Sequence, residues 1–246
     1  MKTAVIVTTF NRPACLARSL PQIVAAAREV GAPVLVVHDE PFYRDKEIES
    51  VCGVPEVESL WLPQNRGLAG ALNIGLAYWL ADPSIEAISY FQDDVSVDPL
   101  CIAACNEVLE VLGEFLVTGH DAKEHREKGT KDMTTRSGVN PSRRQSCRAT
   151  HMMATRESWL RVLPIPSRGL GLPGTRIMDG KRGTGSGVDW HIVRDSPNRL
   201  PVLCIPGLVR SFAHKATDST WLNESIGGEE PVLSRDAIKG WVESRK

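Results

Sequence analysis

Two adjacent carboxylates, Asp93 and Asp94, follow the mostly apolar run 87–91 after one residue, Gln92. Neighbouring negative charges at the end of a buried strand cost free energy unless positive charge lies against them. A divalent cation that bridges a diphosphate supplies that charge, since Mg²⁺ and Mn²⁺ prefer oxygen ligands from carboxylates and phosphates. The pair therefore indicates metal-assisted chemistry on a phosphorylated substrate. The alternative is that one carboxylate caps a turn before Asp98-Pro99.

Positive charge is concentrated between residues 136 and 182, where ten basic residues outnumber two acidic ones in a chain of net charge -1. The basic residues are Arg136, Arg143, Arg144, Arg148, Arg156, Arg161, Arg168, Arg176, Lys181 and Arg182, and the acidic ones are Glu157 and Asp179. Arginine binds two phosphate oxygens at once, so the segment suits a diphosphate and an anionic acceptor. A nucleic acid, with modified DNA as one candidate, or a phosphorylated carrier would fit. The alternative is a solvated loop whose charges bind nothing specific.

The first half of the chain alternates strands and helices that would position these residues. Apolar, β-branched runs predict buried strands, and amphipathic segments with proline near their start or glycine near their end predict helices. The expected strands are 4–7, 34–37, 57–62 and 87–91, and the expected helices are 13–30, 68–80 and 98–112. This order predicts an α/β fold with a Rossmann-like, mostly parallel sheet and flanking helices. Ligands of such sheets bind beyond the carboxyl ends of the strands.

The second half is less regular. A strand edge and a short helix capped near Thr155 are expected over 152–163, and 164–187 has the glycine, proline and arginine content of a mobile active-site loop. A helix is expected over 188–194, followed by two short strands, 202–205 and 208–212, and a last helix from Ser234.

Length and composition favour one domain in a reducing compartment. A chain of 246 residues that is 42% hydrophobic can bury one core, so we expect a single domain over 1–246, with a nucleotide-sugar half at 1–118 and an acceptor half at 119–246. No apolar stretch approaches a signal peptide or a transmembrane span. The six cysteines form no Cys-x-x-Cys pair, which fits a cytoplasmic protein, and Cys101 and Cys105 are expected to pack in the core.

Four segments of the first hundred residues together resemble family-2 glycosyltransferases of the GT-A fold. They are Val5-Ile6-Val7-Thr8-Thr9-Phe10-Asn11-Arg12, Leu35-Val36-Val37-His38-Asp39, Asn65-Arg66-Gly67-Leu68-Ala69-Gly70-Ala71-Leu72-Asn73-Ile74-Gly75 and Gln92-Asp93-Asp94. They occur in the family's order, each at a strand end or in the turn that follows it. The resemblance implies a GT-A fold and sugar transfer from a nucleotide-diphosphate donor, with a UDP-sugar expected, to a hydroxyl acceptor.

The resemblance also implies roles for individual residues. Asp94 is the expected metal ligand, and Asp189, in Gly187-Val188-Asp189-Trp190, matches the base of inverting members. His214, in Ser211-Phe212-Ala213-His214, resembles a late metal-binding histidine, which favours Mn²⁺ (or Mg²⁺) as the cofactor. The expected donor-binding residues are Thr8, Phe10, Asn11, Arg12, Asp39, Asn65, Gly67, Asn73 and Asp93.

Three positions depart from the family pattern. Gln92 replaces the first aspartate of the metal motif, His38 stands where another aspartate is common, and Val188 replaces an acidic neighbour of the base. His38 could contact the nucleotide or make an ordinary hydrogen bond at the strand end. Asp189 could instead cap a helix, and His214 could be a surface or packed residue.

Two other functions remain open at this point. A nucleotidyltransferase of similar fold also uses aspartate-bound Mg²⁺, although the turn Thr8–Arg12 lacks the glycine-rich loop expected of that class. A non-catalytic sugar-nucleotide or polyanion-binding protein is the other alternative, which the missing first aspartate supports.

Overall fold

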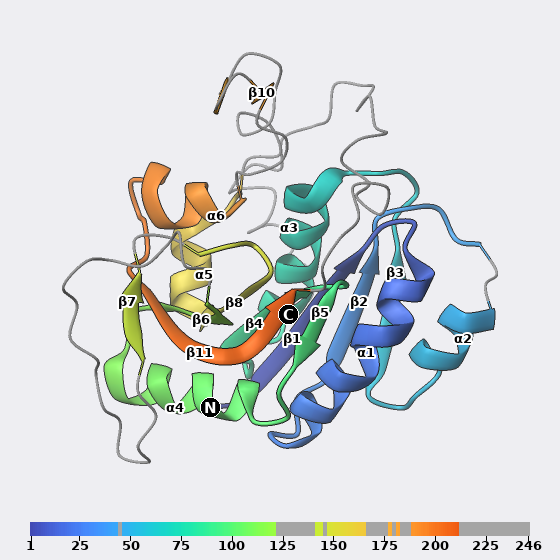
Figure 1. Ribbon diagram of the computed structural model, residues 1–246, viewed down its shortest axis with the longest axis horizontal. Coiled ribbons are helices and arrows are strands. Elements are labelled where there is room, and N and C mark those ends of the chain that lie inside the picture. Colours follow the sequence, from blue (N-terminus) through green and yellow to red (C-terminus); the bar gives the residue numbers. More distant parts are fainter. Residues whose placement is uncertain are drawn as a thin grey trace.

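The computed structural model describes residues 1–43, 46–121, 141–144, 147–165, 177–178, 181–182 and 188–211. Figure 1 shows a twisted central sheet with helices on both faces. The helices are α1 (Pro13–Arg28), α2 (Lys46–Cys52), α3 (Gly67–Leu80), α4 (Cys101–Leu112), α5 (Arg156–Val162) and α6 (Val188–Trp190), which continues as a π-helical segment, His191–Asp195. The predicted α/β architecture with flanking helices is confirmed.

Nine strands of the described residues form one sheet, in the order β3-β2-β1-β4-β8-β6-β11-β5, with β7 also paired to β11. Their bounds are β1 (Thr3–Thr9), β2 (Val34–His38), β3 (Val57–Trp61), β4 (Ala87–Gln92), β5 (Val95–Val97), β6 (Leu116–His120), β7 (Ser142–Arg144), β8 (His151–Thr155) and β11 (Val202–Ser211). A separate small hairpin joins β9 (Ile177–Met178) to β10 (Lys181–Arg182).

The first four strands, β3-β2-β1-β4, are all parallel, as the alternating strand and helix pattern predicts. Helices connect these strands and cover both faces of β1 and β2, which explains the continuous apolar runs of those two strands. The carboxyl ends of β1, β2 and β4 therefore meet at one edge of the sheet, hereafter the carboxyl edge. The end of β1, the turn 10–12 and the residues that follow β2 and β4 lie along it.

The second half of the sheet is mixed. β8 runs antiparallel to both β4 and β6, and β11 runs parallel to β6 but antiparallel to β5 and β7. The two strands expected over 202–205 and 208–212 are instead one long strand, β11, whose register shifts between Cys204 and Val209. Gly207, at φ 89°, allows this bend because it has no Cβ. The chain thereby curls so that the end of β11 pairs with β5.

Two apolar layers hold the sheet between the helices. One packs α3, α5 and α6 on one face, and the other packs α1 and α4 on the opposite face. Buried tryptophans tie helices to strands, since Trp79 Nε1 donates to the Val5 carbonyl at 3.0 Å and Trp159 Nε1 donates to the Ile88 carbonyl at 2.9 Å. A Cβ at Gly75 would lie 2.8 Å from Ile6 Cγ2, so glycine there lets α3 approach β1 closely.

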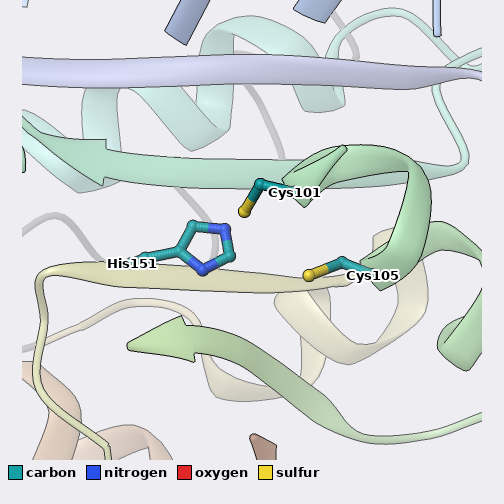
Figure 2. Close-up of side chains that lie close together, drawn as sticks. All are labelled: Cys101, Cys105 and His151. Atoms are coloured by element: carbon teal, nitrogen blue, oxygen red, sulfur yellow. The ribbon is translucent and has the colours of Figure 1, made fainter. Parts of the chain in front are cut away.

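The predicted helix cap at Thr155 is present, where its hydroxyl accepts a hydrogen bond from the Ser158 amide. Cys101 and Cys105 are buried between α4 and the sheet, close to His151 of β8, as Figure 2 shows. None of the helices in the described ranges reaches the length and apolarity that a membrane crossing requires.

Candidate active site

The turn after β1 supplies the first group of polar side chains at the carboxyl edge. Asn11 adopts a left-handed backbone conformation, φ 47°, which asparagine tolerates better than most residues and which turns the chain into α1. The Thr8 hydroxyl lies 3.0 Å from the Tyr90 hydroxyl, and the Thr9 hydroxyl donates to Asp93 Oδ2 at 2.6 Å. The turn is thus tied to β4 by side-chain hydrogen bonds.

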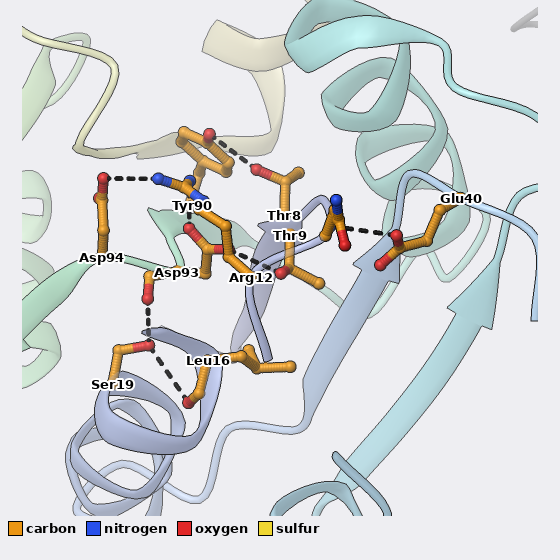
Figure 3. A network of polar contacts seen from close by, with 10 residues as sticks. Thr8, Thr9, Arg12, Leu16, Ser19, Glu40, Tyr90, Asp93 and Asp94 are labelled. Atoms are coloured by element: carbon orange, nitrogen blue, oxygen red, sulfur yellow. Dashed lines mark hydrogen bonds and ion pairs between the residues drawn. The ribbon is translucent and has the colours of Figure 1, made fainter. Parts of the chain in front are cut away.

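The acidic pair lies against Arg12, which directly precedes α1. Figure 3 shows the guanidinium between the two carboxylates: Arg12 Nη1 donates to Asp94 Oδ2 at 3.1 Å, and Nη2 pairs with Asp93 Oδ1. Asp93 is fully buried and Asp94 is 4% exposed. The Ser19 hydroxyl of α1 also donates to the Asp93 carbonyl, at 2.7 Å. Sequence reasoning placed Arg12 among donor contacts but missed this ion pair.

Arg12 partly compensates the negative charge of the acidic pair. Burial raises the pKa of Asp93 to about 7, whereas Arg12 and the Thr9 hydrogen bond favour its charged form. Arg12 supplies part of the positive charge that the sequence argument assigned to a metal. With both carboxylates ionised, the three side chains keep one net negative charge. That charge and the carboxylate oxygens of Asp94 fit a hard divalent cation.

The residues after β2 and those between β3 and α3 also lie at the carboxyl edge, where side-chain oxygens accept hydrogen bonds from backbone amides. Asp39 Oδ1 accepts a hydrogen bond from the Arg66 amide at 2.6 Å, and Asn65 Oδ1 accepts one from the Gly67 amide at 2.9 Å. Gly67 starts α3 with φ 70°, which glycine adopts without strain. These contacts place Asp39, Asn65 and Gly67 at the carboxyl edge, and their donor-binding roles stay predictions.

Glu40 is a carboxylate that sequence reasoning missed, although it directly follows Asp39. It is 8% exposed, and its Oε2 accepts a hydrogen bond from the Asn11 amide at 3.0 Å. Burial raises the pKa of Glu40, which hydrogen bonds from Asn11 and Tyr43 oppose. Glu40 therefore fixes the turn after β1 to the end of β2.

Asn73 lies inside α3 and fixes a loop. Its amide donates to the Ile165 carbonyl at 2.7 Å and accepts from the Ile165 amide at 3.0 Å. Both bonds are buried, so the side chain holds the chain at the point where it leaves α5. A donor contact by Asn73 stays a prediction, and the structure shows a positioning role.

The ring of His38 makes no hydrogen bond within the described part of the chain, and its contact with a nucleotide stays a prediction. It is fully buried and stacks on Trp61 with ring centroids 3.7 Å apart, and both of its ring nitrogens lack a hydrogen-bond partner among the described residues. Burial lowers the pKa of His38 to about 4. The histidine is therefore neutral and acts as an aromatic packing residue.

Replacing His38 with phenylalanine should make stability less sensitive to acid. Between the folded pKa of about 4 and the ordinary value of 6.5, the unfolded chain binds a proton that the folded chain does not, so acidification destabilises the parent. The free-energy gap in favour of His38→Phe should widen by about 2 kcal/mol from pH 7 to pH 5. Urea unfolding at both pH values measures this gap. Phe42→Leu, beside the same tryptophan, is the control, and equal pH slopes for parent and His38→Phe would contradict the prediction.

Asp189 lies in the first turn of α6 and is 6% exposed. Its charge helps to raise the pKa of the Cys147 thiol, whose largest cause is burial, so the two side chains are close. The segment that begins at Cys147 reaches the acidic motif, because the Thr150 carbonyl accepts a hydrogen bond from the Gln92 amide at 3.1 Å. The base assignment of Asp189 stays a prediction.

His214 lies outside the described residues. The described end of β11 nevertheless reaches the acidic pair, since Ser211 pairs with Val95, which directly follows Asp94. Phe10 is half-buried in the turn after β1, and its donor contact also stays a prediction.

Several arginines of the basic segment 136–182 are engaged by acidic side chains or backbone carbonyls of the protein itself. Arg144 pairs with Asp121 at 3.0 Å, Arg161 pairs with Glu114, and Arg156 donates to the carbonyls of Leu80 and Asp82 at the end of α3. Arg143 is exposed and lies 6.0 Å from the Phe115 ring centroid. Arg136, Arg168 and Arg176 lie outside the described residues, and nothing is described of the side chains of Lys181 and Arg182.

Within the described ranges, Cys101, Cys105 and His151 are the one cluster of three or more histidine, cysteine or acidic residues whose ligand atoms all lie within 4.8 Å of one another, a spacing that could suit a metal. His151 Nδ1 accepts from the Gly119 amide at 2.8 Å, so its proton lies on Nε2, which is 3.1 Å from the Ser89 hydroxyl. Burial lowers the pKa of His151 to about 3. Both nitrogens of His151 are thus used within the core, and the two cysteines pack in the apolar core, as expected.

A parallel nucleotide-type half-sheet, a mixed second half and an acidic pair at the carboxyl edge together define the GT-A class of sugar transferases. Residues 4–160, more than half of the chain, match the family model described as Glycosyl transferase family 2. The chain belongs to glycosyltransferase family 2, which confirms the resemblance read from its sequence. No curated protein sequence matches it.

Solved structures agree on the fold. The mannosyltransferase PcManGT from Pyrobaculum calidifontis, in complex with GDP-Man and Mn²⁺, is 14% identical with a TM-score of 0.57, over 84% of this chain and 55% of that one. S. aureus TarS 1-349 in complex with UDP-GlcNAc is 15% identical with a TM-score of 0.52, over 87% of this chain and 60% of that one. The chain therefore spans less than two thirds of the length of either structure. At these identities the likeness concerns the fold alone.

Proposed function

We propose that this chain transfers a sugar from a nucleotide-diphosphate donor to a hydroxyl acceptor, with inversion. The observation that carries the proposal is the carboxyl edge, where Asp94 lies beside Arg12 in a chain of family 2. Family membership favours this reaction over nucleotidyl transfer and over a purely binding role. The similar structures bind GDP-Man and UDP-GlcNAc, which supports a nucleotide sugar as donor. A UDP-sugar remains the donor we expect.

We assign each proposed site residue a role from its place relative to the carboxyl edge and from its match to the family pattern. Asp94 and His214 would hold Mn²⁺ (or Mg²⁺), and a bound cation offsets the negative charge that develops on the departing diphosphate. Arg12, which directly precedes α1, would bind phosphate oxygens. Asp189 would accept the proton of the attacking hydroxyl.

Donor hydrolysis across a panel of UDP- and GDP-sugars tests the proposed reaction. We expect release of nucleoside diphosphate from one member of the panel, loss of that release in excess chelator, and best recovery with Mn²⁺, because imidazole binds Mn²⁺ better than Mg²⁺. Full release in chelator would overturn the metal requirement. No release from any donor in the presence of Mn²⁺ would count against the reaction itself.

We propose an anionic acceptor, with modified DNA as one candidate. The support is the basic excess over 136–182 and a hollow of about 420 Å³ between the end of β6 and β11. Arg210 and His120 line this hollow, together with Asp121, the partner of Arg144.

Retention on immobilised DNA tests the acceptor. Binding should weaken steeply between about 50 and 200 mM salt, because phosphate contacts release counterions. Changing Arg143 and Arg144 together to alanine should lower both retention and transfer. Arg28→Ala, an exposed arginine of α1 paired with Glu56, is the control. A protein that ignores DNA at low salt would direct the search to neutral glycans or small molecules.

A further inference from the structure

Arg12 contacts both carboxylates of the acidic pair, and Asp93 is also fixed to two neighbouring elements. Asp93 has both oxygens engaged, one by the Thr9 hydroxyl at 2.6 Å and the other by Arg12, and its carbonyl is held by Ser19. Asp93 is thereby fixed to β1 and α1. Asp94 lies one residue further, in the short turn between β4 and β5, where Arg12 Nη1 reaches its Oδ2 at 3.1 Å.

Arg12 itself is incompletely satisfied in this position. Its side chain is 16% exposed, and its Nε is buried without a hydrogen-bond partner among the described residues. A buried donor without a partner costs free energy that a new acceptor would recover. The phosphate oxygens of a diphosphate are acceptors that suit a guanidinium.

We propose that Arg12 is a built-in counter-cation, which holds Asp94 while no divalent cation is bound and releases it when a cation and a diphosphate bind together. The proposal rests on the proposed function. With both carboxylates ionised, the pair and Arg12 together carry one net negative charge, and a divalent cation would convert this to one net positive charge beside the guanidinium. Like charges at such distances in a partly buried site repel strongly. A diphosphate removes the repulsion, because it brings negative charge to both Arg12 and the cation.

This mechanism makes cation and diphosphate binding interdependent. Because binding free energies are reciprocal, each ligand should tighten the other by the same factor. Coupling of this kind is typically about 5- to 150-fold. Arg12 is thus a positioning residue for the cation site as well as a candidate donor contact.

Equilibrium dialysis of Mn²⁺ tests the proposal without any turnover. Protein-bound Mn²⁺ is measured against a protein-free reference that contains the same pyrophosphate, because pyrophosphate itself binds Mn²⁺. Inorganic pyrophosphate serves as the diphosphate, since it carries no base or sugar. In the parent, pyrophosphate should tighten Mn²⁺ binding by at least about fivefold. In Arg12→Gln, which removes the charge, Mn²⁺ alone should bind about tenfold tighter than in the parent, and the effect of pyrophosphate should shrink.

Three control variants test whether the charge of Arg12 causes the effect, whether the effect is specific to this position and whether Mn²⁺ binds at the acidic pair. Arg12→Lys keeps the charge and should bind Mn²⁺ alone about as weakly as the parent. Arg18→Gln changes an exposed arginine of the same helix and should leave the affinity unchanged. Asp94→Asn should remove the binding, which shows that the titrated site is the acidic pair and not the cluster of Cys101, Cys105 and His151.

Two outcomes would overturn the proposal. One is Arg12→Gln binding Mn²⁺ alone no more tightly than the parent. The other is a parent in which pyrophosphate leaves Mn²⁺ affinity unchanged, and this measurement does not require the variant to fold. If the protein hydrolyses a nucleotide sugar but gives either of these two outcomes, the counter-cation role of Arg12 is wrong and the proposed function stands. If Mn²⁺ and pyrophosphate bind interdependently but no donor is hydrolysed, the proposed function is wrong and the counter-cation role stands.

Discussion

Asp94→Asn is expected to lower donor hydrolysis and sugar transfer by about a thousandfold. Asparagine keeps the size of the side chain but removes the charge that would hold the cation. Loss of cation stabilisation at the departing diphosphate is worth several kcal/mol, and each 1.36 kcal/mol is a factor of about ten in rate. Arg12 can keep its contact with Asp93 in the variant, so the fold should survive. Steady-state kinetics at saturating Mn²⁺ measure the effect.

The control for this variant is Asp98→Asn. Asp98 is an exposed carboxylate shortly after Asp94, and it accepts a hydrogen bond from the Leu100 amide ahead of α4. Its loss should affect stability slightly and transfer little. An Asp94→Asn variant with near-parental turnover would mean that Asp94 only pairs with Arg12 and that the cation, if required, is held elsewhere.

Asp189→Asn is expected to lower transfer by about 10²- to 10⁴-fold while leaving donor affinity near the parental value, since loss of a general base has effects of that size. Asp189 lies in the first turn of α6, so a merely structural role would lose only the interaction of its charge with the helix dipole, about 0.3–1 kcal/mol of stability, and would leave transfer nearly unchanged. Transfer rates and equilibrium binding of the nucleoside diphosphate, measured on the same preparations, separate the two roles.

Glu157→Gln provides the matched comparison, because Glu157 is an exposed acid in the first turn of α5. It should leave both quantities unchanged. Unchanged turnover in Asp189→Asn would assign Asp189 to the helix alone. A parallel loss of donor affinity would place it on the donor side of the site instead.

In the basic segment 136–182, the number of arginines in the sequence overestimates how many of them are available to bind a partner at the surface. Arg156 has the same formal charge as Arg143, but it donates to the carbonyls of Leu80 and Asp82 at and just after the end of α3, while Arg143 is exposed. Sequence position does not distinguish a guanidinium that ends a helix from one that meets solvent. The distinction depends on which segments pack beside it.

The sequence by itself determined the first half of the fold and the edge where the site lies. Strands 34–37 and 87–91 and helix 68–80 are found within about two residues of their predicted bounds, because hydrophobic periodicity and glycine or proline signals are local. Polar residues that follow buried parallel strands must meet at one edge, so Thr9, Asp39 and Asp93 were placed correctly without any contact being known.

Only the tertiary structure decided what those residues contact. The Arg12 pairing with Asp93 and Asp94, the commitment of Asn73 to Ile165 and the burial of His38 against Trp61 all join segments between 23 and 92 residues apart in sequence. The bend of β11 around Gly207 likewise depends on pairing with both β6 and β5. Side-chain partners are set by packing between distant elements, and local periodicity carries no information about them.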